Sequence, residues 1–310
     1  MRFHTITFKT LSDLLRIKRS IVFLIIMMIL PVIISIILNT TFNLTSMTLA
    51  NQVQTVTMFY IMLVFVWIAG LPLVLFTSVT CGDFITKEEQ DGTLLLLVSK
   101  PVRKYEIILG KYFAFIINIL LLEIIAIIIT PLIMYWLLPI DPYVLDTMAS
   151  LIPSFIFYAM FIAITFGALA TALSCISRSR FKTIMVLVAL TLGIFLGFMF
   201  FRGIMISVDV YDPYVVWGDV NYHMGNSYMY FLDSSGYRIT PPSQALLGTL
   251  TGTYSAVDMS ILYDQDIGAM YPSIPRTTYV DQMVSMLGWL AFTMLMLIVG
   301  ILRFQKREIK

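Results

Sequence analysis

The sequence predicts an all-α polytopic membrane protein with six transmembrane helices. Its mean hydropathy is +0.91, with 59% hydrophobic and 12% charged residues, which is far outside the usage of soluble globular proteins. Six apolar runs are each long enough to cross a bilayer. The Lys and Arg residues are concentrated in alternate connecting segments, which is typical of a chain that crosses a membrane repeatedly.

The spans follow from the thickness of the bilayer. A helix needs about 20 apolar residues to cross about 30 Å of hydrocarbon. The segments that meet this requirement are residues 20–38, 56–80, 112–138, 150–174, 183–201 and 282–302.

The leader, residues 1–19, predicts an amphipathic helix that lies in the membrane interface. Its cations would then lie near anionic headgroups. The alternative is a solvated basic leader. One helical face of this leader carries Phe8, Leu11 and Leu15, and the cations Lys9, Arg16 and Arg19 lie elsewhere.

The distribution of basic residues predicts the orientation of the chain. Seventeen of the twenty Lys and Arg residues fall before the first span, between spans two and three, between spans four and five, and after the sixth span. The other segments hold three. Because basic segments remain in the cytoplasm, both termini are expected there, in a multi-pass protein of the plasma membrane.

The loop 82–111, between spans two and three, carries ten charged side chains, five acidic and five basic. The stretch Thr86-Lys87-Glu88-Glu89 has the form of a capping box, which predicts a cytoplasmic helix beginning at Thr86. Pro101 suits the first turn of a second helix that continues into the third span. Since orientation alone does not require the acidic groups, we interpret the loop as a docking surface.

The same loop contains a motif of the form E-x-x-G-T-L, S-x-P-V, E-I and G-K. It is carried by Glu89, Gly92-Thr93-Leu94, Ser99, Pro101-Val102, Arg103, Glu106-Ile107 and Leu109-Gly110-Lys111. This motif resembles the segment between spans two and three of type-2 ABC exporter permeases. The six spans, the amphipathic leader and the long outer segment are also similar to that family.

The resemblance implies a permease subunit whose loop docks on a cytoplasmic ABC ATPase, with residues 86–99 as the coupling helix. The chain lacks a G-x-x-x-x-G-K-[ST] phosphate loop, so it is not expected to be the ATPase itself, and ATP and magnesium are expected on the partner. A second permease copy or a homologous permease is the other implied partner. Export rather than import rests on the resemblance alone. The implied docking residues are Thr86, Glu88, Glu89, Asp91, Gly92, Thr93, Pro101 and Arg103.

The third span carries an ionisable residue, Glu123, near its middle. Tyr112 and Thr130 share its helical face. A charged group there is costly unless it faces a cavity or a partner. Two interpretations remain open: a polar stripe along a translocation pathway, or a protonated Glu123 that bonds to a neighbouring helix.

The fourth and fifth spans carry small residues at every fourth position, which allows helix backbones to approach closely in lipid. Such stripes predict contact faces, either within the chain or with a second copy. They consist of Ala159, Ala163, Gly167 and Thr171 in one span and Ala189, Gly193 and Gly197 in the other.

The long segment 202–281 predicts a small extracytoplasmic domain with strand-like stretches and turns. It either contacts an extracellular partner, shapes an exit for the cargo or forms a structural cap over the outer gate. Its acidic turns at Asp233 and at Asp264-Gln265-Asp266 lack the full calcium-loop spacing, so no metal site is predicted. The sixth span, 282–302, and a cytoplasmic tail, 303–310, follow.

Two functions are consistent with these features. The first is a permease that forms the transmembrane pathway of an ATP-driven exporter and couples to its ATPase through the loop 82–111. The alternative is a non-transporting anchor or regulator that docks an ATPase and binds a partner through its outer segment. Nucleic acid is not among the expected partners. The sequence offers no nucleophile with an identifiable base in reach, so enzymatic activity is not expected.

Overall fold

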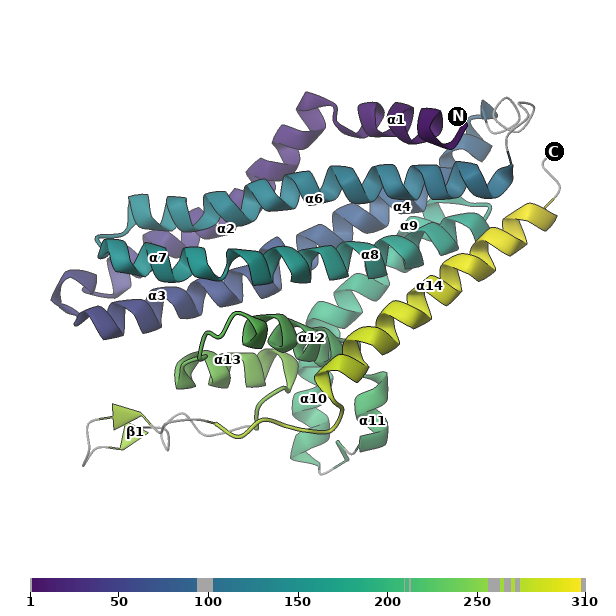
Figure 1. Cartoon of the computed structure of the whole chain (residues 1–310). Coiled ribbons are helices and arrows are strands. Elements are labelled where there is room, and N and C mark those ends of the chain that lie inside the picture. The colour runs from purple at the N-terminus through teal and green to yellow at the C-terminus, as the bar shows by residue number, and fades with distance from the viewer. Residues whose placement is uncertain are drawn as a thin grey trace.

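The computed structural model describes residues 2–93, 103–208, 210–211, 213–255, 263–264, 269–270 and 274–307. These parts of the chain are almost entirely helical (Figure 1). The exception is a short antiparallel pair, β1 (Tyr263–Asp264) with β2 (Ala269–Met270).

Six helical segments in the described residues are long and apolar enough to cross a membrane, and each overlaps one predicted span. Three are α2 (Ile17–Thr41), α6 (Lys104–Leu137) and α14 (Gln282–Lys306). The second span comprises α3 (Leu49–Leu63), the π-helix η2 (Val64–Ile68) and α4 (Leu71–Gln90). The fourth is α8 (Ile152–Ile176), preceded by the short α7 (Pro142–Ser150). The fifth comprises α9 (Arg180–Leu192), the π-helix η3 (Gly193–Gly197) and α10 (Phe198–Ser207).

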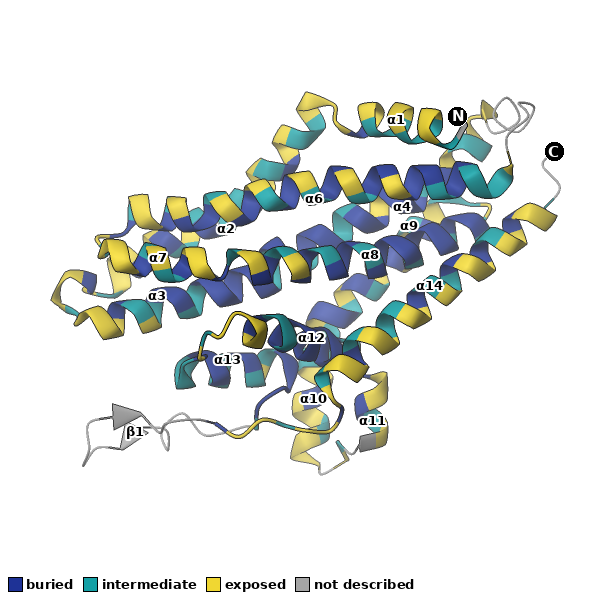
Figure 2. Cartoon of the chain, viewed as in Figure 1, coloured by how far each residue is buried: buried dark blue, intermediate teal, exposed yellow. Residues whose placement is uncertain are grey.

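Helix α8 lies at the centre of the bundle, packed against α4, α6 and α14. It is buried along most of its length, whereas α2 and α14 expose long apolar stripes (Figure 2). Such stripes are what a lipid-facing helix presents to the bilayer. The chain therefore has one enclosed span and several peripheral ones.

The second span is interrupted near its middle. The π-helix η2 ends at a turn, and α4 restarts after Gly70. A Cβ atom on Gly70 would lie 2.3 Å from the carbonyl oxygens of both Phe65 and Val66, so only glycine fits this turn. The break places irregular backbone inside the bundle, where other helices surround it.

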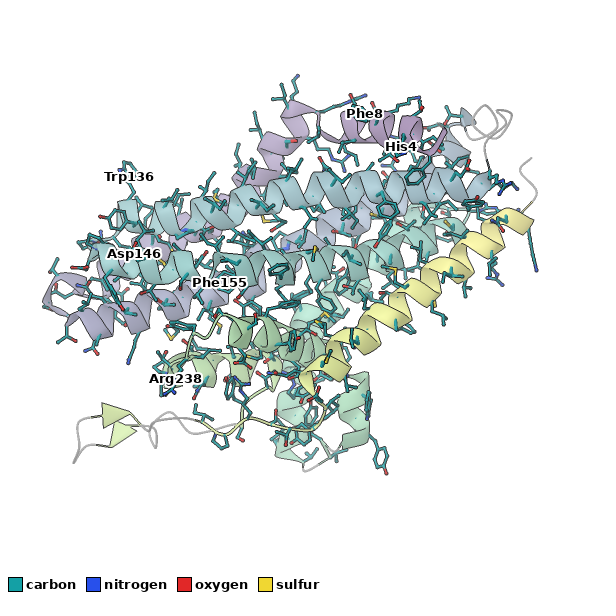
Figure 3. The ribbon with its side chains drawn as sticks, viewed as in Figure 1. His4, Phe8, Trp136, Asp146, Phe155 and Arg238 are labelled. Carbon is teal, nitrogen blue, oxygen red and sulfur yellow. The ribbon has the colours of Figure 1, made fainter. Side chains whose placement is uncertain are left out.

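The leader forms the helix α1 (Arg2–Leu14), as predicted. It packs along the first part of α6, where a Cβ atom on Gly110 would lie 3.1 Å from Ile6. Phe8 is 77% exposed and points away from the bundle (Figure 3). The exposed apolar side chain supports the predicted contact with lipid.

Most of the described outer segment is helical rather than strand-like, and the two-residue strands β1 and β2 are its described strands. Residues 202–207 continue α10, and the segment then forms α11 (Pro213–Gly218), α12 (Val220–Ser234) and α13 (Pro241–Thr251). The Tyr228 hydroxyl of α12 donates to the Ile61 carbonyl oxygen of α3 at 2.7 Å, and its ring stacks on Phe155 of α8. Burial among the spans outweighs the strand propensity of these aromatic residues.

Candidate functional site

One end of the bundle concentrates ion pairs between helices. At this end, which we call the charged end, α4 and α14 finish and α6 and α9 begin, and both chain termini lie nearby (Figure 1). The last two turns of α4 are tied to three other helices here by the pairs Glu88–Lys111, Glu89–Arg307 and Asp83–Arg180.

The first pair joins α4 to α6. The Lys111 ammonium donates to the Phe84 carbonyl oxygen at 2.7 Å and lies 2.5 Å from a Glu88 carboxylate oxygen. The Lys111 side chain is 9% exposed, and that of Glu88 is 23% exposed. A cation buried to this degree depends on its partners, because removing one leaves a poorly solvated charge.

The second pair joins α4 to the end of α14. The Arg307 guanidinium donates to both carboxylate oxygens of Glu89 and also to the Ser177 carbonyl oxygen at 3.0 Å. The Lys104 ammonium, at the start of α6, donates to the Arg307 carbonyl oxygen at 2.8 Å. One arginine thus connects the ends of α4, α6, α8 and α14.

The third pair joins α4 to the start of α9. The Arg180 guanidinium donates to the two Asp83 carboxylate oxygens at 2.7 and 2.9 Å. This two-pronged geometry fixes the orientation of both side chains. A displacement of the end of α4 would therefore act on spans three, five and six together.

The predicted capping box at Thr86 is wrong. Thr86 is buried inside α4, and its hydroxyl donates to the Gly82 carbonyl oxygen, so the helix of span two passes through it without interruption. No new helix begins at Thr86, and α4 continues to Gln90. Gly92 follows with a φ of +68°, which a side-chain-bearing residue rarely adopts. The S/T-x-x-E pattern failed because an apolar span precedes it, and the helix simply continues.

Apart from the buried Thr86, the implied docking residues that the structure describes divide into three groups. Glu88 and Glu89 are already bound inside the chain, whereas Asp91, Gly92 and Thr93 form an exposed tip after α4. Arg103 precedes α6, and its backbone N–H donates to the Glu106 carboxylate at 3.2 Å, so the third span extends back to Lys104 as one helix. Pro101 and residues 94–102 as a whole lie outside the described residues.

The three residues of the predicted pathway are all buried. The Tyr112 hydroxyl donates to the Ile164 carbonyl oxygen of α8 at 2.8 Å, and the Thr130 hydroxyl donates within its own helix. Glu123 is 1% exposed, and neither of its carboxylate oxygens has a partner in the described part of the chain.

Glu123 lies level with the break in span two. Tyr60 of α3 donates to the Ile127 carbonyl oxygen, and Lys111 donates to Phe84 of α4. Since these two contacts align α6 antiparallel to span two, Glu123 falls opposite the region of η2, which also packs against α6. The sequence predicted the ionisable group within the span, and Pro72 in span two indicated a kink there, but nothing in the sequence placed the two beside each other.

The two stripes of small residues behave differently. Gly167 packs against Tyr112 and Phe115 of α6, where a Cβ atom would lie 3.2 Å from each ring, and Ala159, Ala163 and Thr171 are also buried. The first stripe therefore serves packing within the chain. In the second stripe Ala189 is exposed, and a Cβ atom on Gly193 would meet no described atom within 4 Å.

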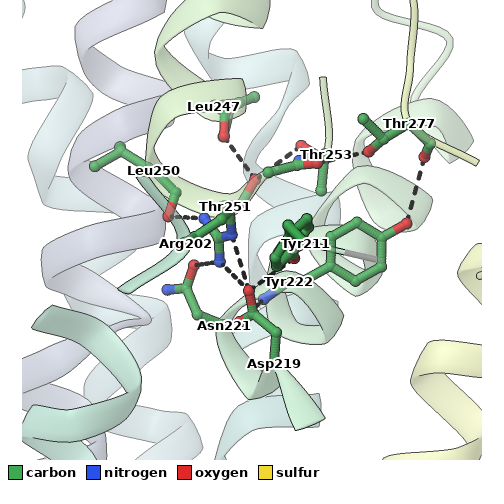
Figure 4. A network of polar contacts seen from close by, with 11 residues as sticks. Arg202, Tyr211, Asp219, Asn221, Tyr222, Leu247, Leu250, Thr251, Thr253 and Thr277 are labelled. Carbon is green, nitrogen blue, oxygen red and sulfur yellow. Dashed lines mark hydrogen bonds and ion pairs between the residues drawn. The ribbon is translucent and has the colours of Figure 1, made fainter. Parts of the chain in front are cut away.

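A buried polar cluster that the sequence did not predict lies at the opposite end of span five (Figure 4). The Arg202 guanidinium of α10 donates to the Asp219 carboxylate at 2.8 Å, to Asn221 at 2.9 Å and to the Leu250 carbonyl oxygen at 3.1 Å. Tyr211 donates to the same Asp219 oxygen at 2.9 Å, and burial beside this carboxylate raises the pKa of Tyr211. Asp219 also caps α12, so the cluster joins α10, α12 and α13.

His223, one turn further along α12, connects the outer segment to the start of α14. Its Nδ1 atom lies 3.0 Å from the Ser285 hydroxyl, and its ring lies among those of Trp217, Tyr222 and Trp289. Burial lowers the pKa of His223. The neutral imidazole is therefore the form that this environment favours.

Comparison with known protein families gives one result that covers nearly the whole chain. The model of a family described as "ABC-2 family transporter protein" matches residues 5–309. No curated protein matches the chain.

Proposed function

The chain belongs to the ABC-2 family of transporter membrane proteins, and from this premise we propose that it is the membrane subunit of an ATP-driven exporter, coupled to its ATPase through the charged end. Members of this family are permease subunits without ATPase domains, so a partner ATPase is implied. The proposed orientation has the charged end and both termini in the cytoplasm, following the distribution of Lys and Arg.

One observation carries the coupling proposal: α4 extends beyond the apolar part of span two and is tied to α6, α9 and α14 by three ion pairs. A partner that moves the exposed tip at Asp91, Gly92 and Thr93 would pull on all of these helices. A ligand shifts a conformational equilibrium only by its differential affinity for the two states. Closure of the ATPases on ATP would supply that difference through the tip.

This proposal assigns separate roles to neighbouring carboxylates. Asp91 is exposed and belongs to the docking tip, whereas Glu89 transmits movement from α4 to α14 through Arg307. Substitution of Asp91 should therefore affect binding of the ATPase, whereas substitution of Glu89 should affect the transmission of movement to α14.

The test is co-purification in lipid nanodiscs with the ATPase encoded beside this chain, followed by measurement of ATP turnover. Asp91→Arg is expected to weaken ATPase binding, and Glu89→Gln is expected to preserve binding while lowering transport-linked turnover. Asp146→Arg is the matched control, because Asp146 is an exposed carboxylate in α7 at the far end of the bundle (Figure 3). Unchanged binding and turnover in both variants would show that the docking assignment is wrong.

A second permease copy fits the open face of span five. The exposed Ala189 and the half-buried Gly193 and Gly197 form a small-residue stripe. An added Cβ atom on Gly193 would meet no described atom within 4 Å, while one on Gly197 would meet only the Phe201 ring of its own span. Stripes of this kind allow close helix contact in lipid. Cysteine substitution of Ala189 is expected to give a cross-linked dimer in membranes, whereas cysteine at the buried Ala163 is not.

The transported cargo is proposed to be apolar. A cavity of about 450 Å³ lies between α8, span five, α12 and α14, with Leu190, Met224 and Trp289 in its wall. The hydroxyls of Thr165 and Thr293, also in the wall, donate to backbone carbonyls of their own helices. The test is stimulation of ATP turnover by hydrophobic compounds as against inorganic ions. Transport into sealed vesicles separates this function from the alternative of a non-transporting anchor.

A further inference from the structure

A second cavity, also of about 450 Å³, lies at the charged end between α1, the start of α2, the end of α4 and the first part of α6. We call it the rim cavity. Its wall contains an unusual density of cations for a chain in which only 12% of residues are charged. These cations are Lys9, Arg16, Arg19, Lys87 and Lys111.

The three carboxylates of the rim cavity are already neutralised. Asp13 pairs with Arg16 at 3.3 Å, Asp83 pairs with Arg180 outside the cavity, and Glu88 pairs with Lys111. Among the described residues, no carboxylate forms an ion pair with Lys9, Arg19 or Lys87, although the charge of Asp83 also acts on Arg19. The cavity thus keeps three cations that are not held in ion pairs and that face a common space.

Arg19 is held in position for an anion. Its guanidinium donates to the Thr80 hydroxyl and lies 4.9 Å above the ring of Phe76. The hydrogen bond uses one of the five N–H donors of the guanidinium. An ordered arginine with spare donors is well suited to phosphate, which it binds in a two-pronged geometry.

The surroundings of the rim cavity indicate the membrane boundary. The lipid-facing helix α2 begins beside it at Ile17, which is 75% exposed, and Ile21 is 50% exposed. On α1, Phe8 is 77% exposed directly before Lys9. Exposed apolar side chains next to the cations are typical of a helix at the membrane interface, so the proposed orientation puts these cations at the depth of the lipid headgroups.

We propose that the rim cavity binds the phosphate group of an anionic phospholipid, with Lys9, Arg19 and Lys87 as its ligands. Basic pockets between helices at a membrane surface recognise such headgroups by charge, and the adjacent apolar surface accommodates the acyl chains. A free phosphate ion would gain the attraction of the cations but not the contact of acyl chains with the apolar surface. A lipid in this position contacts both α1 and the end of α4, so the composition of the bilayer would act on the charged end.

The proposal is tested on the purified full chain, without its ATPase, in mixed micelles of phosphatidylglycerol and phosphatidylcholine with identical acyl chains. Native mass spectrometry measures which lipid is retained. Preferential retention of phosphatidylglycerol is expected to fall about fivefold for each cation removed, and so about 25-fold in the double variant Lys9→Gln/Lys87→Gln. Both side chains are largely solvent-accessible, so the variant is expected to fold.

The matched control is Lys182→Gln/Arg303→Gln, which removes two exposed cations at the same end but outside the rim cavity. Its lipid preference is expected to stay within twofold of the wild type. Equal losses in both double variants, or no preference for phosphatidylglycerol, would overturn the proposal. So would displacement of the lipid by an equal concentration of glycerol phosphate, which would assign the cavity to a soluble anion. In a separate co-purification with the ATPase, loss of association in Lys9→Gln/Lys87→Gln, together with unchanged lipid retention in the micelles, would assign the rim cavity to the protein partner instead.

Discussion

The ammonium of Lys111, on α6, lies 2.5 Å from the carboxylate of Glu88, at the end of α4. Lys111 is the last residue of the charged loop 82–111, and Glu88 lies six residues after its start, so the pair joins the two ends of the loop in the folded chain. The pair fixes where the loop leaves the bundle, so a displacement of the loop reaches the third span directly.

Removing the cation of this pair is expected to destabilise the chain. Lys111→Met should lower the free energy of unfolding by about 3 kcal/mol, because Glu88 would lose its partner while remaining mostly buried. Adding Glu88→Gln should recover a large part of this loss. Denaturant unfolding of the four variants of this double-mutant cycle in one detergent measures the coupling, and additive effects would mean that the two groups act independently.

Reversing the charges of the Glu89–Arg307 pair offers a sharper test of transmission. Glu89→Arg and Arg307→Glu should each lower ATP-coupled transport, since like charges would then face each other across α4 and α14. The combined variant should regain activity because the pair is restored in the opposite sense. Transport into vesicles is the measurement, and failure of the combined variant to recover would argue against transmission through this contact.

The break in span two predicts strong selectivity for glycine. Gly70→Ala should abolish stable expression, because the new Cβ atom would overlap two carbonyl oxygens at 2.3 Å. Gly288→Ala, in α14, is the control, since a Cβ atom there meets no described atom within 4 Å. The yield and unfolding temperature of each purified variant provide the comparison. A Gly70→Ala protein as stable as the control would show that the turn is not required.

Stability is expected to depend on pH through His223. Burial lowers the pKa of His223 in the folded chain, with Asp219 as the nearest opposing charge, whereas the unfolded chain takes up a proton near pH 6.5. Stability should therefore fall as the pH drops below 6.5, by up to about 1.4 kcal/mol per pH unit until the folded-state pKa is reached. His223→Gln should flatten this slope between pH 7.5 and pH 5.5 in unfolding experiments (about one pH unit on either side of the unfolded-state pKa). A slope that is the same in both proteins would assign the effect to other groups.

The buried Arg202–Asp219 cluster should not tolerate lysine. Arg202→Lys keeps the charge but cannot reach Asp219, Asn221 and the Leu250 carbonyl oxygen together, because lysine lacks the planar fork. The expected result is a loss of about 2 kcal/mol or more, within the range for leaving buried polar groups unpaired. Thermal unfolding checks this, with Arg238→Lys as the exposed control in the same outer segment.

The composition of the chain determined its class. Because hydrocarbon sets the length of a span and excludes unpaired backbone, the six apolar runs predicted six helices that the structure contains, and the motif in the charged loop identified the family before any contact was known. The leader could also be predicted as a helix, because the spacing of its apolar residues along one helical face is a local sequence pattern.

Contacts between distant parts of the chain were decided only by the tertiary structure. Glu89 and Arg307 are 218 residues apart, so nothing in the local pattern could show that an apparent docking residue is bound inside the chain. Likewise, the stretch of α12 was predicted to be strand-like, but it forms a helix whose Tyr228 contacts both α3 and α8. The local sequence determines whether a segment can form a helix that spans or lies on the bilayer. The packing of the helices determines which polar groups remain free to bind a partner.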